Sequence, residues 1–93
     1  MMYLKAEARK YLERTISYKD KETGESKSFI DRQLKVELEN GSDVYLRVSD
    51  ELATEENIEY LKNLKGQDIE APFWIKNQKG YVNYNLSDLP IIK

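Results

Sequence analysis

Aliphatic residues occupy every second position over "LKVEL" (34–38) and "VYLRV" (44–48), and the residues between them are mostly charged or polar. This period of two, with several β-branched residues, predicts half-buried strands over 33–39 and 44–49. Asn40-Gly41 separates the two runs, and this pair readily adopts the positive φ of a tight turn. The middle of the chain is therefore predicted to form a β-hairpin.

A helix is predicted over residues 54–65. Thr54 suits the N-cap position. Glu55 and Glu56 follow it in the first turn, where negative charge interacts favourably with the positive end of the helix dipole. Gly66 suits the position just after the helix. The apolar stripe at helical spacing comprises Ile58, Leu61 and Leu64.

The period of two returns in "DIEAPFWIK" (68–76) and "YVNYNL" (81–86), with a turn at 77–80. These segments predict a second hairpin. Pro72 cannot donate a ladder hydrogen bond, so its strand is expected to be an edge strand there or to contain a bulge. The last segment, "SDLPIIK" (87–93), contains a second proline and is expected to be irregular.

The N-terminal third admits two interpretations. Residues 4–14 have high helix propensity, yet small and apolar residues also alternate with polar ones from Met2 to Ala8. We favour a long bent strand, a hairpin loop at "KDKETGES" (19–26) and a second strand over about residues 28–39. A short helix over 4–14 is the alternative.

The resulting element order is β-β-β-α-β-β, within 93 residues that fit a single domain (1–93). This order matches a mainly β fold with one helix, the five-stranded OB-like barrel, which places its helix between strands three and four. The sequence contains no internal repeat and no low-complexity segment that would suggest another architecture.

The composition excludes several chemistries. The chain has no cysteine and no histidine, which excludes disulfides, thiolate zinc sites, cysteine nucleophiles and the commonest general base. Each glycine falls at an expected turn or cap, so no phosphate-binding loop is predicted. We expect no enzyme activity and no cofactor.

The sequence also has no apolar run of about 18 residues that would span a membrane. Its N-terminus is too polar for a signal peptide. A cytoplasmic location is the expectation.

Charge is distributed unevenly along the chain, although its net value is only −2. Residues 1–21 contain six basic and three acidic side chains, whereas residues 50–59 contain five acidic and no basic ones. Acids that could bind a divalent cation in the second segment are Asp50, Glu51, Glu55 and Glu56. We interpret them as the acidic start of the helix and predict no metal site.

The strand pattern also identifies side chains that should face solvent. If Phe73 and Ile75 face the core, Trp74 and Lys76 point outward, because neighbouring residues of a strand alternate between faces. The same argument turns Lys35, Tyr45 and Arg47 outward. Alternatively, Trp74 is partly buried in the core or an interface, and Tyr45 packs across strands.

OB-fold proteins bind nucleic acid across strands two and three and the loops that flank them. Exposed aromatic rings stack on bases, and cations bind phosphates. The predicted nucleic-acid-binding residues are Lys21, Lys27, Lys35, Tyr45, Arg47, Trp74, Lys76, Lys79 and Tyr81. Because the sequence offers no ordered donor and acceptor set, binding should be largely sequence-tolerant.

Three segments carry a resemblance to a known family: "SYKDKETGESKSF" (17–29), "LKVELENGSDVYLRV" (34–48) and "PFWIKNQKGYVNY" (72–84). In their order and pattern, the chain resembles the small OB-fold single-stranded-DNA-binding proteins of phages and mobile elements. The resemblance implies a role in DNA replication, single-stranded DNA as the partner, and a homodimer. The chain lacks an acidic C-terminal tail, so docking of partners through such a tail is not implied.

A second class of function fits the same residues. Exposed aromatics suit a protein interface, and the acidic segment 50–59 suits a basic partner. The alternative is therefore a small protein-interaction module, such as a phage-encoded inhibitor or adaptor of a host protein. An exposed edge near Pro72 would favour a homodimer in either case.

Overall fold

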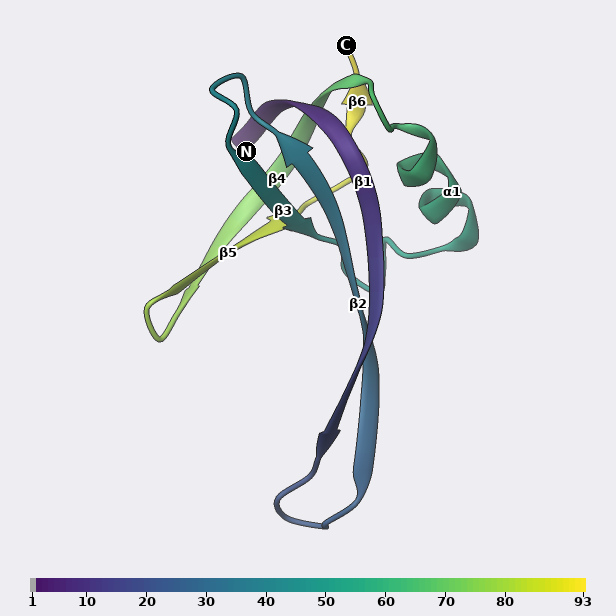
Figure 1. Cartoon of the computed structure of the whole chain (residues 1–93), viewed down its shortest axis with the longest axis vertical. Coiled ribbons are helices and arrows are strands. Elements are labelled where there is room, and N and C mark those ends of the chain that lie inside the picture. Colours follow the sequence, from purple (N-terminus) through teal and green to yellow (C-terminus); the bar gives the residue numbers. More distant parts are fainter. Residues whose placement is uncertain (1) are drawn as a thin grey trace.

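The computed structural model describes residues 2–93 of the chain, as six strands and one helix (Figure 1). In chain order these are β1 (Met2–Lys19), β2 (Ser26–Glu37), β3 (Asp43–Arg47), α1 (Glu55–Asn63), β4 (Asp68–Gln78), β5 (Tyr81–Leu86) and β6 (Ile91–Ile92). The expected order β-β-β-α-β-β is confirmed, with a short sixth strand added at the C-terminus.

The first five strands close into an OB-like barrel in the order β1-β2-β3-β5-β4, with β4 returning to β1. The pairing of β3 with β5 is parallel, and the other pairings in the barrel are antiparallel. This arrangement confirms the predicted fold class.

Strand β1 closes the barrel because it pairs with two neighbours. Residues 2–7 pair with β4, and residues 7–19 pair with β2. A register shift between Ala8 and Lys10 marks a β-bulge, which bends the strand between its two partners. The long bent strand is thus confirmed, and the alternative helix over 4–14 is wrong: pairing first with β4 and then with β2 overrides local helix propensity.

The core consists of the inward-facing aliphatic residues of the strands and the apolar stripe of α1. Leu34 and Leu46 are opposite each other on β2 and β3, and both are fully buried. Leu61 and Leu64 belong to the same buried cluster. Burying one such side chain contributes roughly 1.5–3 kcal/mol. Burial of Leu61 and Leu64 therefore holds the helix against the barrel.

The ends of α1 follow the sequence signals. The Thr54 hydroxyl accepts a hydrogen bond from the backbone N–H of Asn57 at 3.2 Å. The helix ends at Leu64, its C-cap, and Gly66 follows with φ +83°. The N–H of Gly66 donates to the carbonyl of Ala8 at 2.7 Å, which attaches the connection after the helix to the bulge in β1.

The C-terminal segment differs from the expectation of irregular chain. Ile91 and Ile92 form β6, which pairs with Glu70 and Ile69 of β4. Two residues are too few to show a periodic pattern, so the sequence does not predict this strand. It forms because the chain after β5 runs along the part of β4 that β5 does not pair with.

Pro72 does not lie at an exposed edge. It is buried, and β4 has partners on both sides: β1 on one, and β5 and β6 on the other. The Pro72 carbonyl accepts from Ser87 N–H at 2.9 Å, in the gap between the β5 and β6 pairings. The missing N–H of proline falls in that gap, where no ladder bond is required.

Two hairpins extend beyond the closed barrel towards the same end of the molecule (Figure 1). The β1–β2 arm comprises residues 13–32, which lie outside the β2–β3 pairing, and the β4–β5 arm comprises residues 75–83. Ile75 was expected in the core and is 40% exposed. It lies on the inward side of the sheet, but in the arm, where no core remains to cover it.

Candidate nucleic-acid interface

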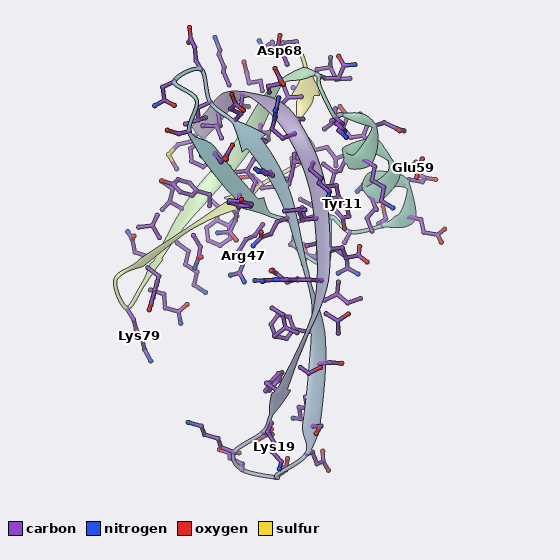
Figure 2. All side chains as sticks on the ribbon, viewed as in Figure 1. Tyr11, Lys19, Arg47, Glu59, Asp68 and Lys79 are labelled. Atoms are coloured by element: carbon purple, nitrogen blue, oxygen red, sulfur yellow. The ribbon has the colours of Figure 1, made fainter. Side chains whose placement is uncertain are left out.

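The strand register places most of the predicted contact residues on one surface. Residues directly paired across a sheet point to the same side of it. Lys35 is opposite Tyr45, and Trp74 is connected through Asn85 to Arg47. The side of the sheet that faces away from the core, here called the outer face, carries Lys27, Lys35, Tyr45, Arg47, Trp74, Lys76 and Tyr81. Arg47 lies between the two arms (Figure 2).

The three aromatic candidates on the outer face are accessible. Tyr45 is 45% exposed, Trp74 is 47% exposed and Tyr81 is 75% exposed. Trp74 is not part of the core cluster, and its place in an interface, the other alternative from the sequence, stays a prediction. Each ring leaves enough surface free to contact a planar ligand.

Two of the predicted cations are paired on the outer face. The Lys35 amino group lies 3.8 Å from the Asp43 carboxylate and 5.9 Å from the centre of the Tyr45 ring. Arg47 lies 3.7 Å from the carboxylate of Asp31. The Lys35–Asp43 pair is partly exposed, and such pairs contribute only about 0–1 kcal/mol, so a phosphate can replace the Asp43 carboxylate at little cost. The Asp31 side chain is 6% exposed, so Arg47 keeps this partner and presents its exposed side to a phosphate.

The cations nearer the tips of the arms have different surroundings. Within residues 2–93, Lys21, Lys76 and Lys79 have no salt-bridge partner. Lys79 and Gly80 form the two-residue turn of the β4–β5 arm, and both have positive φ, as the tight hairpin turns require.

The second strand was expected to begin at about residue 28, but Lys27 already lies in β2, because the β1–β2 ladder continues to the pair Lys19–Ser26. Its amino group lies 2.9 Å from Asp20. This contact and the backbone N–H of Glu22 lower the pKa of the Asp20 carboxyl. Lys27 therefore has a carboxylate partner within the arm, unlike Lys21, but its side chain is still 46% exposed.

The β1–β2 arm adds residues to the outer face that the sequence analysis did not select. Arg14 is opposite Asp31, and Ile16 is opposite Phe29. Tyr18 is 48% exposed and makes an edge contact with Phe29 at 6.1 Å between ring centres. These residues could have been found by pairing the strands on either side of the loop at 19–26 residue by residue, because that register continues the outer face along the arm.

On the inner side of the same arm, Arg32 is engaged within the protein. It lies 3.2 Å from Asp50 and 3.7 Å from Glu13. Glu13 also accepts a hydrogen bond from the Tyr11 hydroxyl, and burial together with this carboxylate raises the pKa of Tyr11 to about 12. These contacts brace the base of the arm and remove Arg32 from the set of free cations.

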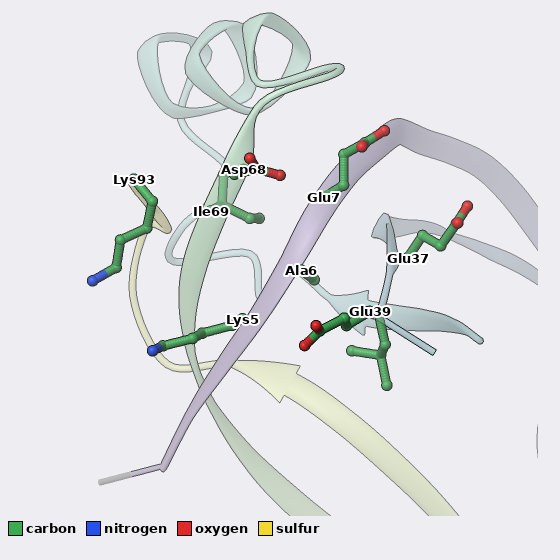
Figure 3. Close-up of a pocket in the computed structure, with 9 residues that line it drawn as sticks. Lys5, Ala6, Glu7, Glu37, Glu39, Asp68, Ile69 and Lys93 are labelled. Atoms are coloured by element: carbon green, nitrogen blue, oxygen red, sulfur yellow. The ribbon is translucent and has the colours of Figure 1, made fainter. Parts of the chain in front are cut away.

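Two groups of acidic side chains lie away from the arms, on α1 and in a hollow of the barrel. Helix α1 packs against β1, and Figure 2 shows Glu59 on the far side of β1 from Arg47. At the end opposite the arm tips, a hollow of about 540 Å³ is lined by four acids and two lysines (Figure 3). These are Glu7, Glu37, Glu39, Asp68, Lys5 and Lys93. The excess of carboxylates makes this hollow unsuitable for a phosphate.

Other features of the described chain limit the chemistry further. Within residues 2–93, no group of three or more Asp and Glu side chains is placed to hold a metal ion. In the same range, no helix is long and apolar enough to cross a membrane.

Comparison with known proteins adds no further constraint. No family model, no curated protein and no solved structure matches this chain.

Proposed function

We propose that the protein binds single-stranded DNA across the outer face of its barrel, largely without sequence preference. The observation that carries this proposal is the coincidence, on one face, of exposed aromatic rings and cations from β2, β3, β4 and β5. Single-strand binders combine a cationic track for the backbone with rings for the bases, and each stacked base contributes roughly 1–3 kcal/mol.

The two kinds of side chain have separate roles. Phosphates are held by Lys21, Lys27, Lys35, Arg47, Lys76 and Lys79, and bases stack on Tyr45, Trp74 and Tyr81. Stacking accepts any base because every base has a π-face. The glutamates of α1 support this placement, since they lie where they do not repel the bound backbone.

Binding is tested by titrating fluorescently labelled oligo-dT, oligo-dC and a mixed sequence, with anisotropy as the readout. We expect similar affinities for the three and a steep fall in affinity as salt rises, because phosphate contacts release counterions. Trp74 is the sole tryptophan, so quenching of its fluorescence reports a base near it.

A combined variant makes the test specific to the outer face. Lys35→Gln, Tyr45→Ala and Arg47→Gln change exposed or half-buried side chains and should leave circular dichroism unchanged. If this folded variant binds as well as the parent, or if the parent binds no oligonucleotide at low salt, the proposal is wrong.

The second candidate is a protein-interaction module, such as a phage-encoded inhibitor or adaptor of a host protein. The observation that favours it is strand β6, where Ile91 and Ile92 are 58% and 48% exposed beside the acidic hollow. A basic, partly apolar partner segment fits that surface. Salt separates the two functions, because an apolar interface does not weaken as steeply as phosphate binding.

A homodimer remains a prediction from the resemblance and from the exposed aromatics. The edge near Pro72 no longer supports it, because that part of β4 is paired on both sides. Light scattering at high micromolar concentration tests it, and a monomer mass would contradict it.

A further inference from the structure

A buried carboxylate lies at the centre of the outer face. The side chain of Asp31 is 6% exposed; it accepts a hydrogen bond from Nε of Arg14 at 3.1 Å and lies 3.7 Å from Nη2 of Arg47. A buried carboxylate is stable only when it is paired. Here two guanidinium groups share one carboxylate, which leaves one positive charge in excess.

Both arginines contact Asp31 on their buried side and are accessible to solvent on the other. The Arg14 side chain is 71% exposed and that of Arg47 is 45% exposed. Asp31 engages the Nε edge of Arg14, and within residues 2–93 the two Nη groups of Arg14 make no hydrogen bond. Guanidinium groups with free N–H donors bind phosphate oxygens in a fixed geometry.

Two hollows adjoin Asp31. One, of about 450 Å³, has Leu12, Gln33 and Tyr45 in its lining together with Arg14 and Glu13. The other, of about 290 Å³, has Phe29, Asn85 and Arg47 in its lining together with Arg32 and Asp50. Each hollow thus combines an aromatic ring, a side-chain amide and one arginine of the pair, and the added carboxylates of Glu13 and Asp50 both pair with Arg32.

We infer that these hollows are two adjacent nucleotide subsites, an inference that rests on the proposed function. One base lies against Tyr45, the next base lies against Phe29, and the phosphate between them is held by Arg14 and Arg47. The apolar rings suit the faces of the bases, and the amides of Gln33 and Asn85 suit their edges. Asp31 acts as a positioning residue because it holds both arginines.

The inference assigns contacts to Arg14 and Phe29, so single variants of these residues test it. Phe29→Ala should weaken binding of labelled oligo-dT by about 5- to 150-fold, as loss of one stacked base does, and Phe29→Tyr should retain affinity. Arg14→Gln should weaken binding and reduce the slope of log affinity against log salt by about one.

The matched control is Arg9→Gln. Arg9 is also an exposed arginine of β1, but it pairs with Glu7 and Glu37 beside the acidic hollow, so its loss should leave the affinity and the salt slope close to those of the parent. Phe29 and Arg14 are exposed, and circular dichroism checks that their variants are folded.

The outcomes separate the inference from the proposed function. If the parent binds oligo-dT and both Arg14→Gln and Phe29→Ala bind as Arg9→Gln does, the subsites are wrong and the proposed function stands. If the parent binds no oligonucleotide, the proposed function fails and the subsites fail with it. If Phe29→Tyr loses as much affinity as Phe29→Ala, stacking on this ring is wrong.

Discussion

The two arms are extensions of strands of the closed barrel, yet apolar side chains are buried in the barrel and exposed in the arms. Leu34 and Leu46 in the barrel are at most 1% exposed, whereas Ile30 and Val82 in the arms are 42% and 52% exposed. Ile30 and Leu34 are on the same strand and point to the same side of the sheet. Alternation along a strand therefore determines to which side of the sheet a residue points, but it does not determine whether the residue is buried.

The difference arises where the barrel ends. Leu34 has Leu46 of β3 opposite it and the helix stripe in the same cluster. Ile30 lies beyond the last pair of β2 with β3, so only the facing strand of the hairpin covers it. An arm with two open faces adds little to the core but offers an extended surface to a ligand, which is why the proposed contacts continue onto it.

The sharpest test of this comparison is a matched pair of truncations. Leu46→Ala should lower the free energy of unfolding by about 2–5 kcal/mol, because it leaves a cavity in the barrel. Ile30→Ala should change it by no more than about 0.5 kcal/mol, as exposed substitutions do. Urea denaturation measures both. A similar loss for the two variants would show that the arm is part of the cooperative core.

The next effect concerns the ligand. Trp74→Ala should cost about 1–3 kcal/mol of binding free energy for oligo-dT if the ring stacks on a base. Trp74→Phe, which retains a ring, should lose less. Anisotropy of a labelled oligonucleotide measures the affinity, and denaturation checks that the barrel is intact. Unchanged affinity in a folded Trp74→Ala variant would remove this residue from the site.

Two glycines extend the comparison to the backbone. Gly41, in the loop that joins β2 and β3, has φ +87°, and Gly24, at the tip of the β1–β2 arm, has φ +72°. Alanine at either position is strained by about 1–2 kcal/mol. We expect Gly41→Ala to lower global stability by that amount.

Gly24→Ala should act locally instead. We expect faster hydrogen exchange in the arm with little change in global unfolding, since arms of this kind open by themselves. A global loss of stability as large as that of Gly41→Ala would contradict the independence of the arm.

Single cations should have smaller effects on affinity and a clear effect on its salt dependence. Lys76→Gln on the outer face should reduce the slope of log affinity against log salt by about one. Lys93→Gln, which removes the partner of Glu70 near the acidic hollow, should leave the slope unchanged. Equal slopes for the two variants would mean that phosphates do not pass over Lys76.

The smallest expected effect is a titration in the arm. Lys27 lowers the pKa of Asp20, so their contact favours the folded arm above the ordinary carboxyl pKa and is lost as pH falls through the lowered value. Lys27→Gln should return the pKa of Asp20 towards its ordinary range. Carboxyl chemical shifts measured against pH give both values, and an unchanged pKa in the variant would show that the contact does not form in solution.

The sequence by itself determined the order of the elements and the face of most strand residues. The alternation around Asn40-Gly41, the cap at Thr54 and the stripe of α1 are local signals, each complete within a few residues. Because side chains on a strand point alternately to its two sides, the outward positions of Tyr45, Arg47 and Trp74 followed from the same local pattern.

Only the tertiary structure decided what depends on distant segments. The covered position of Pro72, the exposure of Ile75 and the pairing of β6 follow from how β4 lies between β1, β5 and β6. Likewise, Arg14 and Asp31 are 17 residues apart in the chain and meet through the register of a long hairpin. Local patterns carry no information on which residue lies opposite which, because register and barrel closure are properties of the whole sheet.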